Sequence, residues 1–81
     1  ESIVCPLTER RDFRGQNHSG RDLEDFDFSN SIVAGVDFSR SSLWMADFSR
    51  SDCSGANFTR ADLTFADFAL ARLDGADFRF A

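Results

Sequence analysis

The sequence predicts an all-β solenoid, in which the chain winds into a four-sided parallel β-helix of about 20 residues per coil and about 3.5 coils. Two observations predict this fold. Every fifth residue from Phe13 to Phe78 belongs to one series, and eleven of its fourteen members are Phe or Leu. Within that series, the same residue types recur every 20 residues. A period of five fits neither an α-helix nor a plain β-strand, so the chain must be built from a short bent unit.

Each five-residue unit divides into a straight side and a corner. In extended backbone, residues two apart point to the same face, so the series residue and the residue two before it should both point inward. That second residue is usually Ala or Ser in the later units, and an Asp or Asn lies between the two in eleven of the fourteen units. All five glycines lie at the second corner position, where a type II turn requires a positive φ angle.

The number of corners in a coil follows from the longer period. Residues that are 20 apart are often of the same type, whereas a spacing of 15 groups Gly15 with Asn30, Met45 and Arg60. The 20-residue sets are Gly15, Gly35, Gly55 and Gly75; Leu23, Leu43 and Leu63; Phe28, Phe48 and Phe68; and Phe38, Phe58 and Phe78. Four sides therefore make one coil, and like residues should stack about 4.8 Å apart, the usual distance between paired strands.

The repeated unit resembles that of the pentapeptide-repeat proteins. The resemblance rests on Ala46-Asp47-Phe48, Ala56-Asn57-Phe58, Ala61-Asp62-Leu63, Ala66-Asp67-Phe68 and Ala76-Asp77-Phe78, and it extends over residues 11–81. It implies a right-handed quadrilateral β-helix and, from the habit of the family, a bacterial source.

The two ends depart from the repeat. Residues 1–10 precede it and are expected to form an N-terminal cap on the β-helix of residues 11–81. The first coil is irregular, since Arg11, Gln16, Arg21 and His18 fall at positions expected to point inward. Ala81 stops within the pattern, so we expect either that the native protein continues or that two copies form an end-to-end homodimer at the C-terminal coil.

Composition narrows the classes of function. A net charge of −5 argues against a nucleic-acid binder. Because the chain has no run of 18 apolar residues and no secretory signal, we expect no membrane association and a cytoplasmic location.

No residue pattern indicates catalysis, a cofactor or a metal. His18 has no second ligand at a useful spacing, and Cys53 takes a Phe/Leu position, which is typical of a buried structural thiol. Cys5 lies in the expected cap. The aspartates recur at one position of the unit, which indicates a structural role rather than a catalytic pair. We therefore expect a protein that is not an enzyme.

Apolar residues at outward positions give the best functional indication. Corner positions that are mostly polar or Gly in the other units are occupied by Trp44, Met45, Phe65, Leu70 and Phe80. An exposed apolar edge is typical of a protein-interaction surface, or equally of packing against an adjacent domain.

The sequence thus favours a non-enzymatic scaffold and protein-interaction module of the pentapeptide-repeat type. The alternative is a DNA mimic that binds a type II topoisomerase, as the resemblance to fluoroquinolone-resistance members of the family implies. A rod of roughly 17 Å would match about ten DNA phosphates, which exceeds the charge of this chain. We therefore place the DNA mimic second.

Overall fold

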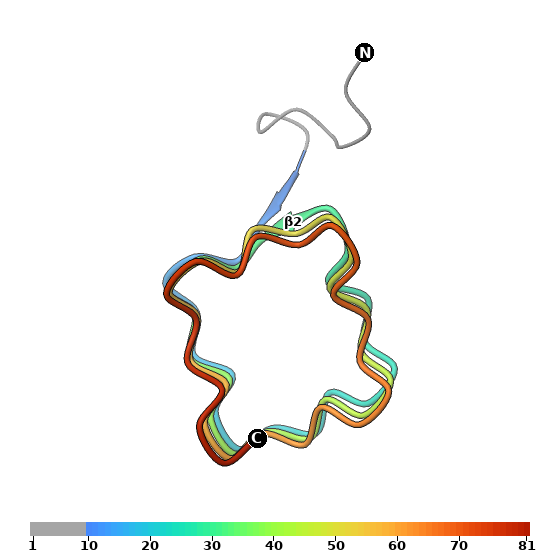
Figure 1. Ribbon diagram of the computed structural model, residues 1–81, viewed down its shortest axis with the longest axis vertical. Helices are drawn as coiled ribbons and strands as arrows, with labels where there is room; N and C mark the ends of the chain where they lie inside the picture. The colour runs from blue at the N-terminus through green and yellow to red at the C-terminus, as the bar shows by residue number, and fades with distance from the viewer. Residues whose placement is uncertain (1–9) are drawn as a thin grey trace.

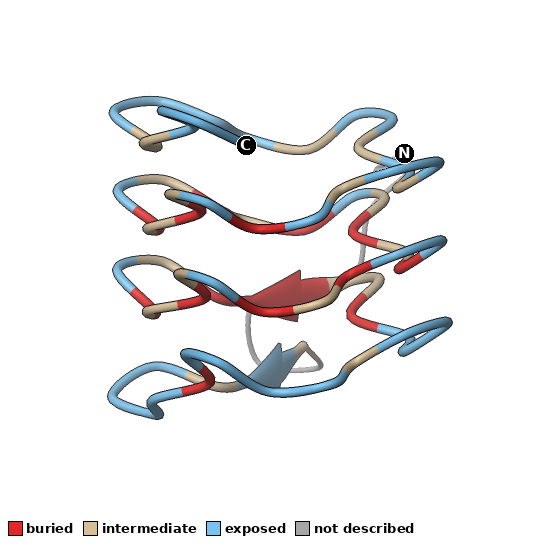
Figure 2. Cartoon of the chain, turned by 90° about the horizontal axis from the view of Figure 1, so that it is seen from below, coloured by how far each residue is buried: buried red, intermediate tan, exposed pale blue. Residues whose placement is uncertain are grey.

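The computed structural model describes residues 10–81, and these form a four-sided solenoid (Figure 1). Viewed down its axis, the chain traces the same square outline in each coil, and the side view shows the coils stacked in layers (Figure 2). No residue from 10 onward is helical. The two named strands, β1 (Arg11–Asp12) and β2 (Ser31–Ile32), pair in parallel, with Arg11 opposite Ser31 and Asp12 opposite Ile32.

The remaining sides pair through single parallel bridges, and every bridge joins residues 20 apart. The register runs Asn17–Asp37–Asn57–Asp77, Asp22–Ser42–Asp62, Asp27–Asp47–Asp67 and Ile32–Asp52–Arg72. The pairing stays this short because each side turns a corner after five residues. The coil period that the sequence predicts is therefore the register of the structure.

Backbone hydrogen bonds run between coils along each side. The amide of Phe48 donates to the carbonyl of Asp67 at 2.7 Å, and the amide of Asp67 donates back to the carbonyl of Ala46 at 2.9 Å. A third bond leaves the corner, where the amide of Met45 donates to the carbonyl of Thr64 at 2.8 Å. These bonds satisfy backbone groups that would otherwise be costly to bury.

Each corner contains one residue with a positive φ angle. All five glycines adopt it, as predicted, with φ between 67° and 82°. Nine residues that are not glycine adopt it as well, with φ between 52° and 60°: Asp25, Asn30, Arg40, Met45, Arg50, Arg60, Phe65, Leu70 and Phe80. This conformation is unfavourable for a side chain with a Cβ atom, so the stacked coils hold these corners in a strained geometry.

The Asp or Asn before each series residue binds the following corner. In all eleven units that contain one, a side-chain Oδ1 accepts a hydrogen bond from the amide two residues later. Asp47 and Ser49 are typical, at 2.9 Å. Asp and Asn commonly fix turns in this way. The structural role predicted for the aspartates is confirmed.

The core is built from columns of aromatic rings on two opposite sides of the coil. Phe38 and Phe58 stack 5.2 Å apart, and Phe48 and Phe68 stack 5.1 Å apart, with both pairs within 4° of parallel. Rings of different columns meet edge-on, as Phe38 and Phe48 do at 85°. Leu43, Val33 and Cys53 fill the other two sides and are fully buried. Stacked and edge-on arrangements both suit the ring quadrupole.

Small inward residues complete the core. Ser31, Ser41 and Ser51 are buried beside the rings. The hydroxyl of Ser41 donates to the carbonyl of Phe38 at 2.6 Å, so its buried polar group is satisfied.

The first coil requires a correction. It was expected to be irregular, but its backbone keeps the regular register, and Arg11, Gln16 and Arg21 are exposed. A long polar side chain is better solvated at the end of the stack, and Figure 2 shows that the outer coils are mostly exposed. In this coil only His18 and Phe28 are buried. The cap predicted for residues 1–10 lies outside the described residues, apart from Arg10.

Candidate protein-interaction surface

Three apolar side chains form a ridge along one corner of the solenoid. We define the apolar ridge as Trp44, Met45 and Phe65. All three are exposed, with exposed fractions of 37%, 46% and 76%. Met45 and Phe65 occupy equivalent corner positions in successive coils and both have φ of 59°. The corner geometry therefore directs apolar side chains outward, as the sequence predicts. Both residues adopt a positive φ angle although this conformation is unfavourable for residues with a Cβ atom.

The ridge is held together by an aromatic contact. The ring centroids of Trp44 and Phe65 lie 6.3 Å apart at an interplanar angle of 75°, which is an edge-on arrangement. The sequence places Phe65 over Met45, but the contact with Trp44 depends on side-chain rotamers that a repeat pattern does not specify.

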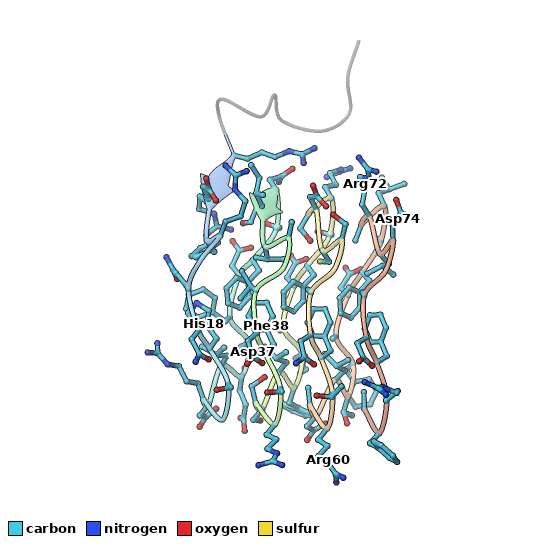
Figure 3. All side chains as sticks on the ribbon, turned by 90° about the vertical axis from the view of Figure 1, so that its left-hand side faces the viewer. His18, Asp37, Phe38, Arg60, Arg72 and Asp74 are labelled. Carbon is cyan, nitrogen blue, oxygen red and sulfur yellow. The ribbon has the colours of Figure 1, made fainter. Side chains whose placement is uncertain are left out.

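Leu70 and Phe80 are exposed too, but they lie on the two neighbouring corners. Phe80 covers the guanidinium of Arg60, which lies 4.9 Å from the ring centroid, and Figure 3 shows Arg60 pointing away from the coil. The structure therefore brings three of the five predicted residues together and leaves these two apart. Phe26, also exposed, was not predicted. The sequence signal was a large ring at a position that later units give to Ala or Ser.

Charge is divided unequally between the two halves of the solenoid. The two sides that meet at the apolar ridge comprise residues 21–30, 41–50 and 61–70, and we call them the ridge half. The ridge half contains seven acidic residues, Asp22, Glu24, Asp25, Asp27, Asp47, Asp62 and Asp67, and two arginines, Arg21 and Arg50.

The opposite half has the reverse balance. Within the described residues it contains five acidic residues, Asp12, Asp37, Asp52, Asp74 and Asp77, and seven arginines, Arg10, Arg11, Arg14, Arg40, Arg60, Arg72 and Arg79. Three of the four ion pairs join residues within this half: Arg14–Asp12, Arg72–Asp74 and Arg79–Asp77. The fourth, Arg11–Asp27, reaches across to the ridge half at 3.4 Å. The apolar ridge therefore lies in the acidic half.

Hydrogen bonds keep acidic groups of the ridge half ionised. The hydroxyl and amide of Thr64 lower the pKa of Asp62, and those of Ser29 lower the pKa of Asp27. Both carboxylates are negative throughout the neutral range, since even their ordinary pKa of 3.8 lies far below it.

The remaining titratable groups do not form a reactive site. Burial raises the pKa of the Cys53 thiol to about 11, so the thiol stays protonated, in keeping with the structural role predicted for it. Cys5 lies outside the described residues. Among residues 10–81 there is no pocket and no cluster of three potential metal ligands.

His18 lies at the end of one aromatic column. Its ring stacks on that of Phe38 with the centroids 5.5 Å apart, and its Nε2 donates to Oε1 of Gln16 at 2.8 Å. Figure 3 shows His18 and Phe38 side by side. Nδ1 is buried without a hydrogen-bond partner in the described part of the chain. Burial first, and then the charge of Arg21, lower the pKa of His18. The ring is thus a neutral member of the core.

The fold and surface define the class of protein, which is a four-sided β-solenoid with a regular core and an irregular outer surface. Residues 46–79 match the family model for pentapeptide repeats, in eight copies. The chain is similar to the crystal structure of a pentapeptide repeat protein from the thylakoid lumen of Arabidopsis thaliana, at 25% identity and a TM-score of 0.52. That alignment covers 82% of this chain and 60% of the other, so the chain spans about three fifths of its neighbour's length.

Residues 46–79 are therefore pentapeptide repeats, and the four-sided solenoid agrees with the right-handed quadrilateral β-helix of this family. No curated protein matched the sequence. The described residues contain no helix that is long and apolar enough to cross a membrane.

Proposed function

We propose that this protein is a non-enzymatic scaffold that binds another protein, or an adjacent domain, through the apolar ridge. The observation that carries the proposal is the exposure of Phe65 in an unfavourable backbone conformation. An exposed ring at such a position contributes little to folding, so its value to the protein is better explained by a contact outside the chain.

The remainder of the solenoid can act as a rigid support for such a contact. Phe38 and Phe48 and the rings next to them, Phe28 and Phe58, are fully buried, and the two columns pack edge-on against one another. A ridge fixed to a rigid frame loses little conformational entropy on binding.

Site-specific photo-crosslinking in cells tests the proposal. A benzoylphenylalanine residue in place of Met45 should capture a protein, whereas the same residue in place of Gly35, on the glycine corner, should not. Capture at position 45 should disappear when Trp44 and Phe65 are both replaced by Ala. Equal capture at positions 45 and 35 would contradict the proposal.

The DNA-mimic alternative receives no specific support from the charge distribution. DNA is negative on every side, whereas the arginines of this chain gather on the half opposite the ridge. An assay of gyrase supercoiling gives a direct check, since a mimic should inhibit the enzyme.

An end-to-end homodimer and a cytoplasmic location stay predictions. Leu73 and Phe78 of the last coil are partly exposed and would be covered in such a dimer. Analytical ultracentrifugation would detect the dimer, and replacing Phe78 by Ser should weaken it.

A further inference from the structure

We infer that the partner of the apolar ridge is a basic amphipathic segment of another protein, with an apolar stripe bordered by Lys or Arg. This inference rests on the proposed function and names the chemistry of the partner. The structure supplies two matching features, an apolar strip and acidic rows on both sides of it.

The acidic rows follow from the register of the coils. Asp22 and Asp62 lie on the side before the ridge corner, and Asp27, Asp47 and Asp67 stack on the side after it. Successive coils repeat at about 4.8 Å, so Asp27, Asp47 and Asp67 form a ladder of like charges, whereas Ser42 lies between Asp22 and Asp62 in the other row. Like charges at that spacing repel one another, and a basic partner would relieve the repulsion.

These carboxylates have few basic neighbours of their own. Among the described residues, the only ion pair that involves the ridge half is Arg11 with Asp27, at 3.4 Å. On the opposite half, by contrast, Asp12, Asp74 and Asp77 each pair with an arginine. Among residues 10–81, an arginine thus pairs with three of the five acidic residues of the opposite half but with only one of the seven of the ridge half.

The ridge alone is small. Its three side chains form a narrower contact than a standard protein interface, which buries about 800 Å² on each partner. Complementary charge around an apolar centre raises the association rate and excludes acidic partners. An amphipathic helix presents this arrangement, because its apolar stripe has polar residues on both sides.

Titration with a synthetic peptide tests the inference. The probe is a 14-residue helical Leu/Lys peptide without Trp, and its control is the same peptide with Glu in place of Lys. Trp44 is the only tryptophan of the chain, so its fluorescence reports directly on the ridge. We expect the Leu/Lys peptide to shift Trp44 emission saturably, and the Leu/Glu peptide to leave it unchanged at the same concentrations.

Two triple variants distinguish the effect on peptide binding of charges beside the ridge from the effect of the net charge of the protein. The first is Asp47→Asn, Asp62→Asn and Asp67→Asn, beside the ridge, and the control is Asp37→Asn, Asp52→Asn and Asp77→Asn, on the other half. All six replaced residues accept the same amide hydrogen bond, and Asn fills that role already at position 57. Both triples change the net charge equally.

The ridge-half triple should weaken Leu/Lys binding about tenfold at low salt, as expected from three exposed charges, and the control triple by less than twofold. Equal weakening by both triples, or equal binding of the two peptides, would overturn the inference. If neither peptide binds but crosslinking at position 45 still captures a protein, the partner chemistry is wrong and the proposed function stands. If crosslinking fails as well, both are wrong.

Discussion

The indole of Trp44 meets the ring of Phe65 edge-on, with centroids 6.3 Å apart, although both side chains lie outside the core. The rings of the core make the same kind of edge-on contact between columns, as Phe48 and Phe58 do at 89°. The apolar ridge is therefore ordered by the same interaction as the interior but remains open to a partner.

The aromatic columns should dominate stability. Phe48 is fully buried and stacks on Phe28 and Phe68, so Phe48→Ala should lower the free energy of unfolding by about 3–5 kcal/mol. Phe78→Ala is the matched control, because this ring lies in the last coil and is 36% exposed, and its loss should cost clearly less. Urea denaturation measures both. A cost below about 1 kcal/mol for Phe48→Ala would mean that the columns do not carry the fold.

The corner-binding aspartates should respond to the side-chain acceptor and to acid. Asp37→Ala removes the acceptor for the amide of Ser39 and should cost about 0.5–1.5 kcal/mol, whereas Asp37→Asn keeps an acceptor and should cost less. The hydroxyl and amide of Ser39 lower the pKa of Asp37 below 3.8. Its contribution is therefore complete above pH 3.8 and is lost as the pH falls through the lower, folded value.

Thermal unfolding between pH 7 and pH 2 gives the measurement. The acid-induced loss should be smaller in Asp37→Asn than in the native chain. A variant as acid-sensitive as the native chain would contradict this role for Asp37.

His18 should make the native chain less stable in mildly acidic solution. Its pKa is lowered by burial, so the folded state resists protonation, and stability should fall as the pH drops below the ordinary value of 6.5. His18→Phe continues the column below Phe38 and removes the buried, unpaired Nδ1. It should raise the melting temperature and abolish the change between pH 7.5 and pH 5. If the variant retains the change in melting temperature between pH 7.5 and pH 5, a titratable group other than His18 causes it.

Backbone strain at the corners predicts that reverse substitutions at two neighbouring corners change the stability in opposite directions. Arg50 has φ of 59°, and Arg50→Gly should stabilise by about 0.5–1 kcal/mol, since the relief of strain exceeds the added entropy of the unfolded chain. Gly55→Arg makes the reverse change at φ of 67° and should destabilise by a similar amount. The space there is adequate, because an added Cβ would lie 4.0 Å from its nearest neighbour, the amide nitrogen of Gly35. Shifts in the same direction for both variants would refute the argument.

The sequence predicted the architecture because each side repeats the same physical requirements. Phe48 must point inward, Asp47 must bind the next corner, and Gly55 must adopt a positive φ, and each requirement leaves its residue type at a fixed spacing. The positive φ of Arg50 and Phe65 was not predicted from their residue types. The turn between two sides of the coil requires this φ angle whatever the side chain, so residue type gives no indication of it.

The first coil and the surface were less predictable. The first coil was expected to be irregular because Arg11 falls at an inward position, but its backbone is regular and Arg11 is exposed at the end of the stack. The ridge residues were identified as exceptions to the repeat, yet the contact between Trp44 and Phe65 needed the side-chain geometry. The separation of charge could have been obtained from the 20-residue register by assigning each charged residue to its side.

The double variant Trp44→Ala and Phe65→Ala tests the central claim most directly, with urea unfolding and binding of the Leu/Lys peptide measured on the same sample. Both side chains are exposed, so the free energy of unfolding should change by less than about 1 kcal/mol, and binding should be lost. An unfolded variant would show that the apolar ridge belongs to the fold. A folded variant that binds the peptide as tightly as the native chain would show that the ridge is not the interaction surface.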